Sequence, residues 1–408
     1  MERFHGILGI LLILGIAFAF SNNRKRINYR LVISGILLQT IIAILILKVQ
    51  PVTWFFQQLG KGMEKIELFA KQGAGFVFGG VMVNTPDGVM DYRVGGFVFA
   101  FSVMATIILV CVLVALLYHI GFMQKLVAII AKAMNFVMRV SGAEALSNVA
   151  SAFVGQVEAQ VMIRPYLPGM TKSELLASMS GSLACIAGGI LIVYANMGAK
   201  AEYLIAASLM AAPGALVISK IVYPETEESE TMGKVKLEVK SQYKNLIDAI
   251  SHGASDGMKI SLNVIAMLIG FIALVALINY GLGAIHPMLS LDFVFGKLFY
   301  PIAWSMGIPM EDVSNAAALL GQKLTINEFV AFSNLTSGTL PIMSEKGLLI
   351  VSIAICGFAN FSSVGMQIGG IGEIAPSRRG DLAKLGMRAL LCGTLASYLS
   401  ATLAGIIH

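Results

Sequence analysis

Two acidic residues lie in stretches that are otherwise apolar enough to enter a membrane. Glu158 follows Gly155–Gln156–Val157 in region 143–169, and Glu328 follows Asn327 in region 311–345. An ionised carboxylate inside a membrane is costly unless it faces protein or water, so each acid calls for a substrate, a coupling ion or a buried partner. The basic residues nearest to them in the chain are Arg164 and Lys323, and neither is placed to neutralise both acids.

The polar residues around these acids favour a neutral, hydroxyl-rich solute. No arginine lies beside either acid, which argues against a carboxylate or phosphate substrate. A carboxylate can accept two hydroxyl donors at once, as a vicinal diol would offer them, and an aromatic ring supplies an apolar wall. A polyol or a nucleoside-like solute is therefore favoured, with an organic cation second, and the candidate residues are Gln156, Glu158, Glu328, Phe358, Asn360 and Ser363.

The elements that position these residues are membrane helices. Hydrophobic residues make up 57% of the 408 and charged residues 13%, about half the roughly 25% of soluble domains. Several apolar stretches reach the roughly 20 residues that cross a bilayer. The fold class predicted is an all-α membrane protein with eight transmembrane helices, near residues 4–21, 31–49, 95–118, 173–195, 202–222, 258–281, 347–373 and 382–407.

The basic residues indicate topology rather than a nucleic-acid partner. They raise the net charge to +6 but gather in short clusters between the apolar stretches. The cluster Arg24–Lys25–Arg26 places the first loop in the cytoplasm and the N-terminus outside. Residues 54–73 combine apolar and basic residues at helical spacing, which fits an amphipathic helix on the outer surface or an ordinary loop helix.

The two acidic regions are predicted to be re-entrant hairpins and copies of each other. Glycine, proline and amide residues interrupt both, and irregular backbone at membrane depth must line a cavity or be buried in protein. Similar motifs occur in the same order: Glu144 to Asn148 with Glu311 to Asn315, and Leu167–Pro168 with Leu340–Pro341. Three spans separate the copies, so the second is inverted, as in many secondary transporters. The spans that follow are interrupted at Ala187–Gly189 and at 357–363.

This organisation divides the chain into four parts. They are a scaffold of spans one to three with the amphipathic helix (1–118), a first transport repeat with hairpin 143–169 and spans four and five (119–222), a cytoplasmic linker with scaffold span six (223–281), and a second transport repeat with hairpin 311–345 and spans seven and eight (282–408).

From about Gly95 onward, the sequence resembles the concentrative nucleoside transporters. The resemblance is carried by Gly155 to Glu158, by 327–332 (NEFVAF), by 356–363 (CGFANFSS) and by 375–379 (APSRR). It implies a homotrimer in the plasma membrane, here a bacterial inner membrane, with a mobile transport domain. The implied function is nucleoside import by symport with sodium or protons, with no enzymatic activity and no cofactor besides the coupling ion.

The resemblance also assigns roles to individual residues. It implies nucleobase recognition by Gln156, Val157 and Glu158 with Ile190 beside them, and ribose recognition by Glu328, Asn360 and Ser363 with Phe358 close by. The implied sodium site uses Ser151, Val154, Cys185 and Ile186.

Two residues depart from the family pattern. Val157 stands where the family usually has serine or threonine, and Cys185 stands where it has serine. A thiol is a poor sodium ligand, so proton coupling through Glu158 is an alternative to sodium. A transporter of another polar solute, a channel and a membrane enzyme are the further alternatives. The enzyme has no HExxH, GxSxG or P-loop motif to support it.

Overall fold

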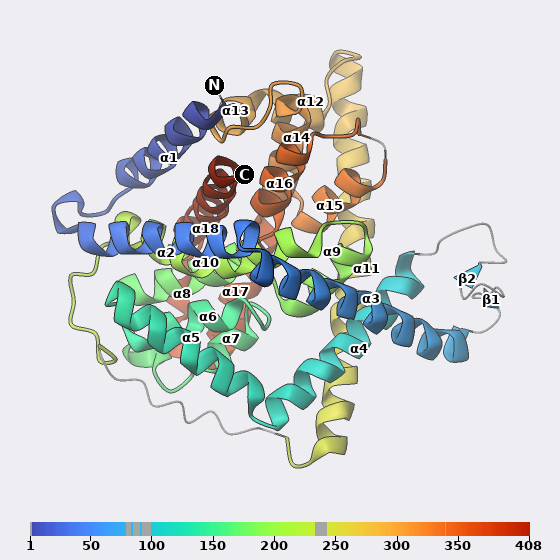
Figure 1. The fold of residues 1–408 in the computed structure, drawn as a ribbon, viewed down its shortest axis with the longest axis horizontal. Helices are drawn as coiled ribbons and strands as arrows, with labels where there is room; N and C mark the ends of the chain where they lie inside the picture. Colours follow the sequence, from blue (N-terminus) through green and yellow to red (C-terminus); the bar gives the residue numbers. More distant parts are fainter. Residues whose placement is uncertain (1, 79–82, 85–89, 92–98, 233–242, 339) are drawn as a thin grey trace.

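The chain is almost entirely helical (Figure 1). The computed structural model describes residues 2–78, 83–84, 90–91, 99–232, 243–338 and 340–408. Its first part consists of α1 (Glu2–Ala19), η1 (Arg24–Arg26), α2 (Tyr29–Lys48), α3 (Gln50–Phe78), a short ladder of β1 (Val83–Asn84) and β2 (Met90–Asp91), α4 (Phe99–His119) and α5 (Phe122–Met138). The predicted start of the third span at residue 95 lies outside the described residues.

The rest of the chain contains two similar series of helices. The first series is α6 (Gly142–Ser151), α7 (Glu158–Val161), η2 (Leu167–Gly169), α8 (Lys172–Ala184), α9 (Gly188–Asn196) and α10 (Ala201–Val222). The second is α14 (Val313–Thr325), α15 (Glu328–Thr336), α16 (Glu345–Ile355), α17 (Phe361–Ile374), η3 (Pro376–Arg378) and α18 (Arg379–Ile407). Between them lie α11 (Leu246–Ile285), α12 (Leu291–Leu298) and α13 (Tyr300–Ser305). The five α-helices of each series come in the same order, whereas the short 3-10 helix follows α7 in the first series and α17 in the second.

Each series contains a helix that is broken in the middle. The chain leaves α8 at Ala184 and enters α9 at Gly188, and it leaves α16 at Ile355 and enters α17 at Phe361. The breaks at 185–187 and 356–360 overlap the interruptions predicted at 187–189 and 357–363, although Gly188, Gly189 and residues 361–363 are already helical. A hydroxyl residue caps the start of each broken helix: Thr171 accepts from the N–H of Glu174, and Ser344 accepts from the N–H of Gly347. Equivalent caps 173 positions apart support the repeat at the level of local structure.

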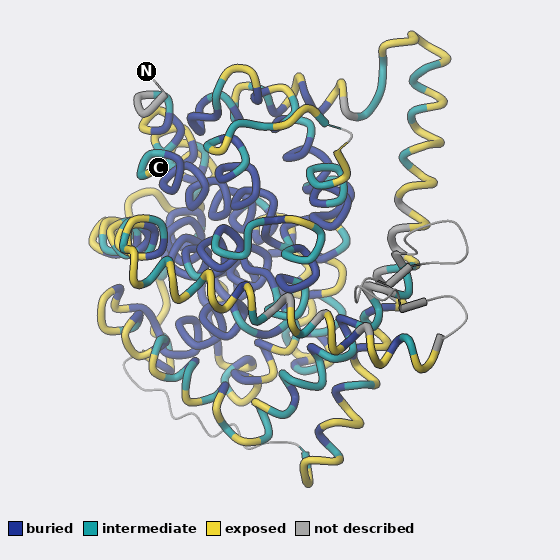
Figure 2. Tube along the Cα trace, turned by 45° about the vertical axis from the view of Figure 1, so that its right-hand side comes forward, coloured by how far each residue is buried: buried dark blue, intermediate teal, exposed yellow. Residues whose placement is uncertain are grey.

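The broken helices form the buried centre of the molecule together with two unbroken ones. Helices α10 and α18 pack against each other, and each packs against both α8 and α16. Figure 2 shows these segments as the buried interior, with exposed residues along α1, α2 and α3. Leu176, Leu216, Ile350 and Leu399, one from each of the four helices, are fully buried. The breaks at 185–187 and 356–360 are therefore held inside protein.

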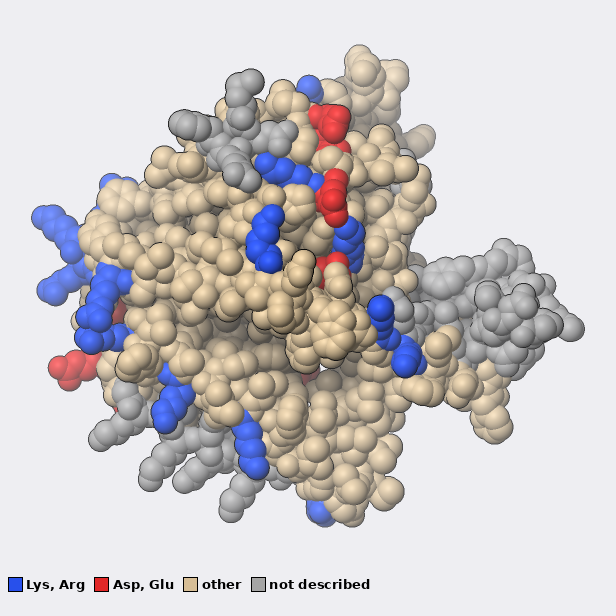
Figure 3. Space-filling model, in the orientation of Figure 1, with Lys and Arg blue, Asp and Glu red and all other residues tan. Residues whose placement is uncertain are grey.

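Four segments are long and apolar enough to cross a membrane. They are Tyr29–Lys48, Lys172–Asn196, Ala201–Val222 and Pro376–Ile407. Met104–His119 and Phe122–Met138 pass the same test only as a pair bent by 75°. Over much of one face of the molecule the surface is neither basic nor acidic (Figure 3). The chain is a membrane protein, and four of the eight predicted spans are long, apolar helices among the described residues.

Two helices are longer than predicted. The amphipathic helix predicted at 54–73 is the longer α3, and the predicted sixth span lies within the 40-residue α11. Helix α5 was not predicted. Met123, Val127, Ala131 and Met134 are buried at spacings of three and four, which makes α5 amphipathic.

Candidate functional site

Glu328 begins α15 and is held by two side chains from elsewhere in the fold. It is 7% exposed. Its Oε2 accepts a hydrogen bond from Asn360 Nδ2 at 2.8 Å, and its Oε1 accepts from the Tyr194 hydroxyl at 3.3 Å. The Tyr194 ring stacks on Phe332 of α15 with centroids 4.4 Å apart. A carboxylate in the first turn of a helix is also favoured by the helix dipole. The residue predicted to bind a hydroxyl-rich solute is thus fixed in position.

Asn360 is placed by the break between α16 and α17. Its Oδ1 caps α17 by accepting from the N–H of Ser363 at 2.8 Å, and it also accepts from the Ser362 hydroxyl at 2.8 Å. Because the oxygen is used in the cap, the amide nitrogen points toward Glu328. The sequence predicted that Asn360 and Ser363 lie together. The structure shows that the asparagine side chain bonds the serine backbone.

Replacement of Asn360 by Asp tests this arrangement. Aspartate caps a helix as well as asparagine, so α17 should still form. The donor to Glu328 is lost, however, and a second carboxylate faces it. A hydrogen bond to a charged group contributes about 1.5–3 kcal/mol, so we expect the affinity for a hydroxyl-rich solute to fall about 10- to 100-fold. Isothermal titration of the purified protein measures the change.

The matched control is Asn28→Asp. Asn28 caps α2 in the same way, through the N–H of Leu31 at 3.2 Å, but it lies away from Glu328. We expect its affinity to match that of the unaltered protein. Equal affinities for Asn28→Asp and Asn360→Asp would show that the contact between Asn360 and Glu328 has no part in binding.

Gln156 and Val157 contact α17 from the other end of the site. The Gln367 amide donates to Gln156 Oε1 at 3.4 Å and to the carbonyl of Met179 at 3.2 Å. The Val157 side chain packs closely on Gly370: a Cβ added to Gly370 would lie 2.7 Å from Val157 Cγ1. Helix α17 therefore joins the two predicted groups, with Asn360 at its start and the Gln156 contact in its middle.

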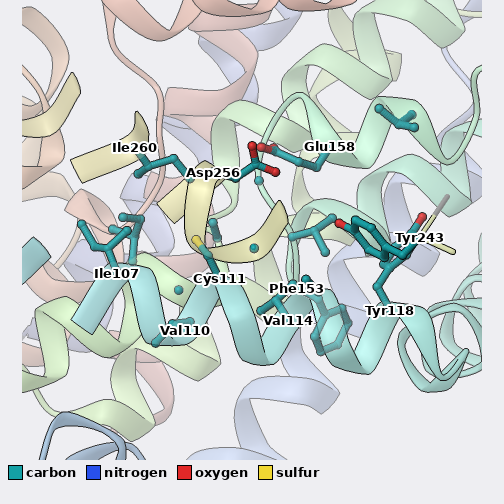
Figure 4. A pocket seen from close by; sticks show the side chains of 18 residues that line it. Ile107, Val110, Cys111, Val114, Tyr118, Phe153, Glu158, Tyr243, Asp256 and Ile260 are labelled. Atoms are coloured by element: carbon teal, nitrogen blue, oxygen red, sulfur yellow. The ribbon is translucent and has the colours of Figure 1, made fainter. Parts of the chain in front are cut away.

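Glu158 and Ile190 line a cavity of about 170 Å³. Helices α4 and α11 supply the opposite wall, including Cys111, Tyr118 and Asp256. Figure 4 shows the carboxyl groups of Glu158 and Asp256 pointing toward each other. Glu328, Phe358, Asn360 and Ser363 do not line this cavity. The structure thus brings together Glu328 with Asn360 and Glu158 with Ile190, but it does not unite the two acids in one cavity.

The four residues predicted to bind sodium lie where the first helix pair (α6 and α7) meets the break of α8. The N–H of Gly188 donates to the carbonyl of Phe153 at 3.2 Å, next to Val154. Ser151 Oγ donates to the carbonyl of Ser147 at 2.7 Å and shares a hydrogen bond with Ser182 Oγ at 2.8 Å. Ile186 is fully buried beside Cys185.

The Cys185 side chain and carbonyl have other contacts. Its thiol lies 4.0 Å from the carbonyl of Asn148 and 3.8 Å from that of Ser208. Its carbonyl accepts from the N–H of Phe358 at 3.2 Å, so the two broken helices are bonded at their breaks. This thiol lies where the family pattern has a hydroxyl, and it is a weak ligand for a hard cation.

Sequence reasoning missed three buried polar residues around the site. Tyr194 lies one helical turn after Ile190, a spacing that could have identified it. Gln160, fully buried, joins α7 to α8 by donating to Ser182 Oγ at 2.8 Å and accepting from Ser178 Oγ at 2.6 Å. Gln367 bridges α17 to Gln156. No sequence spacing indicates Gln160 or Gln367, because their hydrogen-bond partners lie 18 or more positions away along the chain.

The sequence matches three models of one family along its length. Residues 8–81 match the N-terminus of the Na+ dependent nucleoside transporters, residues 100–201 match a domain described as "Nucleoside recognition", and residues 203–405 match the C-terminus of the same transporters. Together the three models cover most of the chain, including both acidic regions.

Curated relatives are similar over the whole chain. The nucleoside permease NupC of Helicobacter pylori is 38% identical over 98% of this chain and 96% of its own. An uncharacterized transporter of Bacillus subtilis, YutK, is 39% identical over the full length of both chains. The mouse sodium/nucleoside cotransporter 1 is 36% identical over all of this chain and 64% of its own.

Solved structures agree with the fold. CNTnw in an inward-facing, substrate-bound state superposes with a TM-score of 0.92 at 38% identity, over 100% of this chain and 98% of that one. An outward-facing variant of CNTnw superposes with a TM-score of 0.93. Family models, relatives and structures all point to transport and not to catalysis. The chain belongs to the concentrative nucleoside transporter family.

Proposed function

We propose that this protein imports nucleosides across the bacterial inner membrane by symport with a cation. The observation that carries the proposal is the buried Glu328, held by Asn360 at the break between α16 and α17 and by Tyr194 of α9. A carboxylate fixed in a dry site accepts two hydroxyl donors without reorganisation, and a ribose supplies two neighbouring hydroxyls. The family to which the chain belongs supports a nucleoside as the source of that ribose.

In this proposal the ribose binds Glu328, Asn360 and Ser363, with Phe358 as an apolar neighbour. Phe358 is half-buried, and its carbonyl accepts a hydrogen bond at 2.8 Å from the N–H of Asn360, the residue that caps α17. Tyr194 orients the carboxylate. A sugar that lacks the 2′-hydroxyl should bind more weakly, since one acceptor position on Glu328 is then left unpaired.

The nucleobase binds toward Gln156, Val157, Glu158 and Ile190. Gln156 supplies an amide that reads donors and acceptors on the base edge. Val157 packs on Gly370 and offers no hydrogen bond, which leaves the polar recognition of the base to Gln156 and Glu158. Glu158 and Ile190 line the same cavity, so a base placed between them has one polar and one apolar contact.

Sodium is the coupling ion that the matched family indicates, and we propose Ser151, Val154, Cys185 and Ile186 as its site. A proton is the second candidate, and the Cys185 thiol is the observation that favours it. In that case Glu158, which faces the cavity, carries the proton. Binding of the cation and of the nucleoside favour each other in either case, because thermodynamic coupling is reciprocal.

The membrane arrangement forms part of the proposal. It has eight spans, an outside N-terminus, inverted repeats, and α6–α7 and α14–α15 as re-entrant hairpins. The basic turn Arg24–Arg26 supports the orientation. A homotrimer is also part of the proposal, and the large apolar side chains exposed on α11, such as Ile269 and Leu277, are covered by a partner subunit or by lipid. The hairpins and broken helices move past the remaining helices as an elevator.

Uptake into proteoliposomes tests the function and identifies the ion. The purified protein is given labelled uridine or adenosine under an inward sodium gradient at equal pH, and then under an inward proton gradient without sodium. The membrane potential is clamped in both arms. We expect saturable accumulation above equilibrium in one arm only. Equilibration without accumulation in both arms would indicate a channel. Competition by free ribose or free nucleobase as strong as that by nucleoside would indicate another solute.

A further inference from the structure

The second helix pair (α14 and α15) contains a lysine without a hydrogen bond. Lys323 lies in the last turn of α14 and is fully buried. Its Nζ has no hydrogen-bond partner among the residues that the structure describes. An ammonium group away from water is costly unless an opposite charge compensates it. The position of Lys323 therefore requires a negative group within electrostatic reach.

The other buried lysine of the described chain shows how this fold usually meets that need. Lys220 Nζ, 5% exposed, lies 2.7 Å from Glu144 Oε2 and 3.1 Å from Glu225 Oε2, and it also donates to Ser173 Oγ at 3.0 Å. Lys220 thus has direct partners in three directions. Lys323 has none, so its role differs from that of a structural ion pair.

Glu328 is the acidic residue nearest to Lys323 along the chain, and both side chains are buried. It is only five residues further along the chain, at the start of the next helix, and the two charges attract each other through space. No ion pair within 4.0 Å joins them in the described structure. The other titratable side chains around Glu328 are Tyr194 from α9 and Cys356 from the end of α16, and neither supplies a positive charge.

The absence of a direct contact with Lys323 leaves acceptor positions open on the Glu328 oxygens. Each already accepts one neutral donor, from Asn360 and from Tyr194, and each keeps a lone pair for a ligand. A direct ion pair with Lys323 would occupy those positions. Without a direct contact, in a medium of low dielectric constant, the ammonium still favours the ionised form of the acid.

We propose that Lys323 is the internal counter-ion of the ribose carboxylate: it keeps Glu328 ionised from a distance and so leaves both oxygens available to the sugar. This inference rests on the proposed nucleoside function. Because Lys323 and Glu328 belong to one helix pair, they move together as a neutral unit. Glu158, by contrast, has a second acid, Asp256, as its charged neighbour. In this proposal the coupling cation therefore compensates negative charge beside Glu158 and not beside Glu328.

Nucleoside affinity as a function of pH tests the proposal. In Lys323→Gln, Glu328 loses its counter-charge and takes up a proton at a higher pH than in the unaltered protein. A protonated carboxyl accepts fewer sugar hydroxyls. We therefore expect weak binding near neutral pH that recovers on raising the pH, with affinity falling about tenfold for each pH unit below the new midpoint. Lys323→Arg should restore the original profile.

Lys220→Gln is the matched control for loss of a buried lysine. It should lower the melting temperature without moving the midpoint of the binding profile, since Lys220 lies beside Glu144 and Glu225. A Lys323→Gln profile that runs parallel to that of the unaltered protein would overturn the proposal, as would failure of Lys323→Arg to restore it.

Thermal stability provides a second test that needs no nucleoside. Lys323→Gln and Glu328→Gln each leave one buried charge uncompensated, so each should lower the melting temperature. The double variant should melt above either single variant, because it removes both charges. Additive losses would overturn the charge pairing. If the unaltered protein binds no nucleoside, the proposed function fails, while this cycle still decides whether the pair exists.

Discussion

Glu328→Gln is expected to abolish nucleoside accumulation while the protein still reaches the membrane. Glutamine has the shape of glutamate and can keep the contacts to Asn360 and Tyr194, so the fold should persist. An amide has one oxygen, however, and cannot accept both ribose hydroxyls. The loss of two charge-assisted hydrogen bonds, each contributing about 1.5–3 kcal/mol, predicts a decrease in uptake of about 100-fold or more. Initial rates for uridine and adenosine in proteoliposomes measure it.

Glu345→Gln is the control for this experiment. Glu345 begins α16 as Glu328 begins α15, but its side chain is 65% exposed and pairs with Lys200 at 2.8 Å on the surface. The hydrogen bond with Lys200 lowers the pKa of Glu345, which keeps it ionised at neutral pH. An exposed ion pair contributes little, so uptake should stay near normal. Near-normal uridine and adenosine accumulation by Glu328→Gln would disprove the ribose assignment.

The second large effect, a loss of thermal stability, is expected on substitution of Gly357, where the breaks of the two helices contact each other. A Cβ at this position would lie 2.3 Å from the carbonyl oxygen of Ala184 and 2.8 Å from its carbonyl carbon. Neither is the end of a flexible side chain. Gly357→Ala must therefore separate α16 from α8 and break the bond from Phe358 N–H to the Cys185 carbonyl. Overpacking of a core typically costs about 1–3 kcal/mol, and a rigid backbone contact lies at the upper end.

Gly365→Ala is the matched substitution. Gly365 lies within α17 and has no atom within 4 Å of where its Cβ would be. Alanine favours a helix over glycine by about 1 kcal/mol, so this variant should melt at the same temperature or higher. Gly357→Ala should lower the melting temperature by several degrees or prevent purification of folded protein. Equal melting temperatures for the two variants would mean that the helices do not cross at Gly357.

The sequence alone was sufficient for the features that depend on local pattern. Apolar stretches of membrane length predicted α2, α8–α9, α10 and α18, and the interrupted stretches 187–189 and 357–363 predicted the approximate positions of the breaks. Repeated motifs predicted two series of helices. These inferences succeed because hydrophobic burial, backbone freedom at glycine and helix capping act within a few residues of each other.

Side-chain direction was not predictable in the same way. The resemblance assigned Glu158 to the nucleobase and Glu328 to the ribose, and only the structure shows their surroundings: Glu158 faces a cavity shared with α4 and α11, while Glu328 bonds Asn360 and Tyr194. Tyr194 is 134 positions away from its partner. Which face of a short helix points toward which neighbour is set by packing between helices, and that packing is not encoded in any single window of sequence.

What the sequence predicted by itself is that two costly carboxylates lie in broken, repeated membrane segments. A charge inside an apolar segment is recognisable without coordinates, because its desolvation must be compensated somewhere. Only the tertiary structure decided where that compensation comes from. Lys323 was visible as one of two possible partners, but its burial, its lack of a direct contact and its position toward Glu328 arise from the way α14, α15 and α16 pack together.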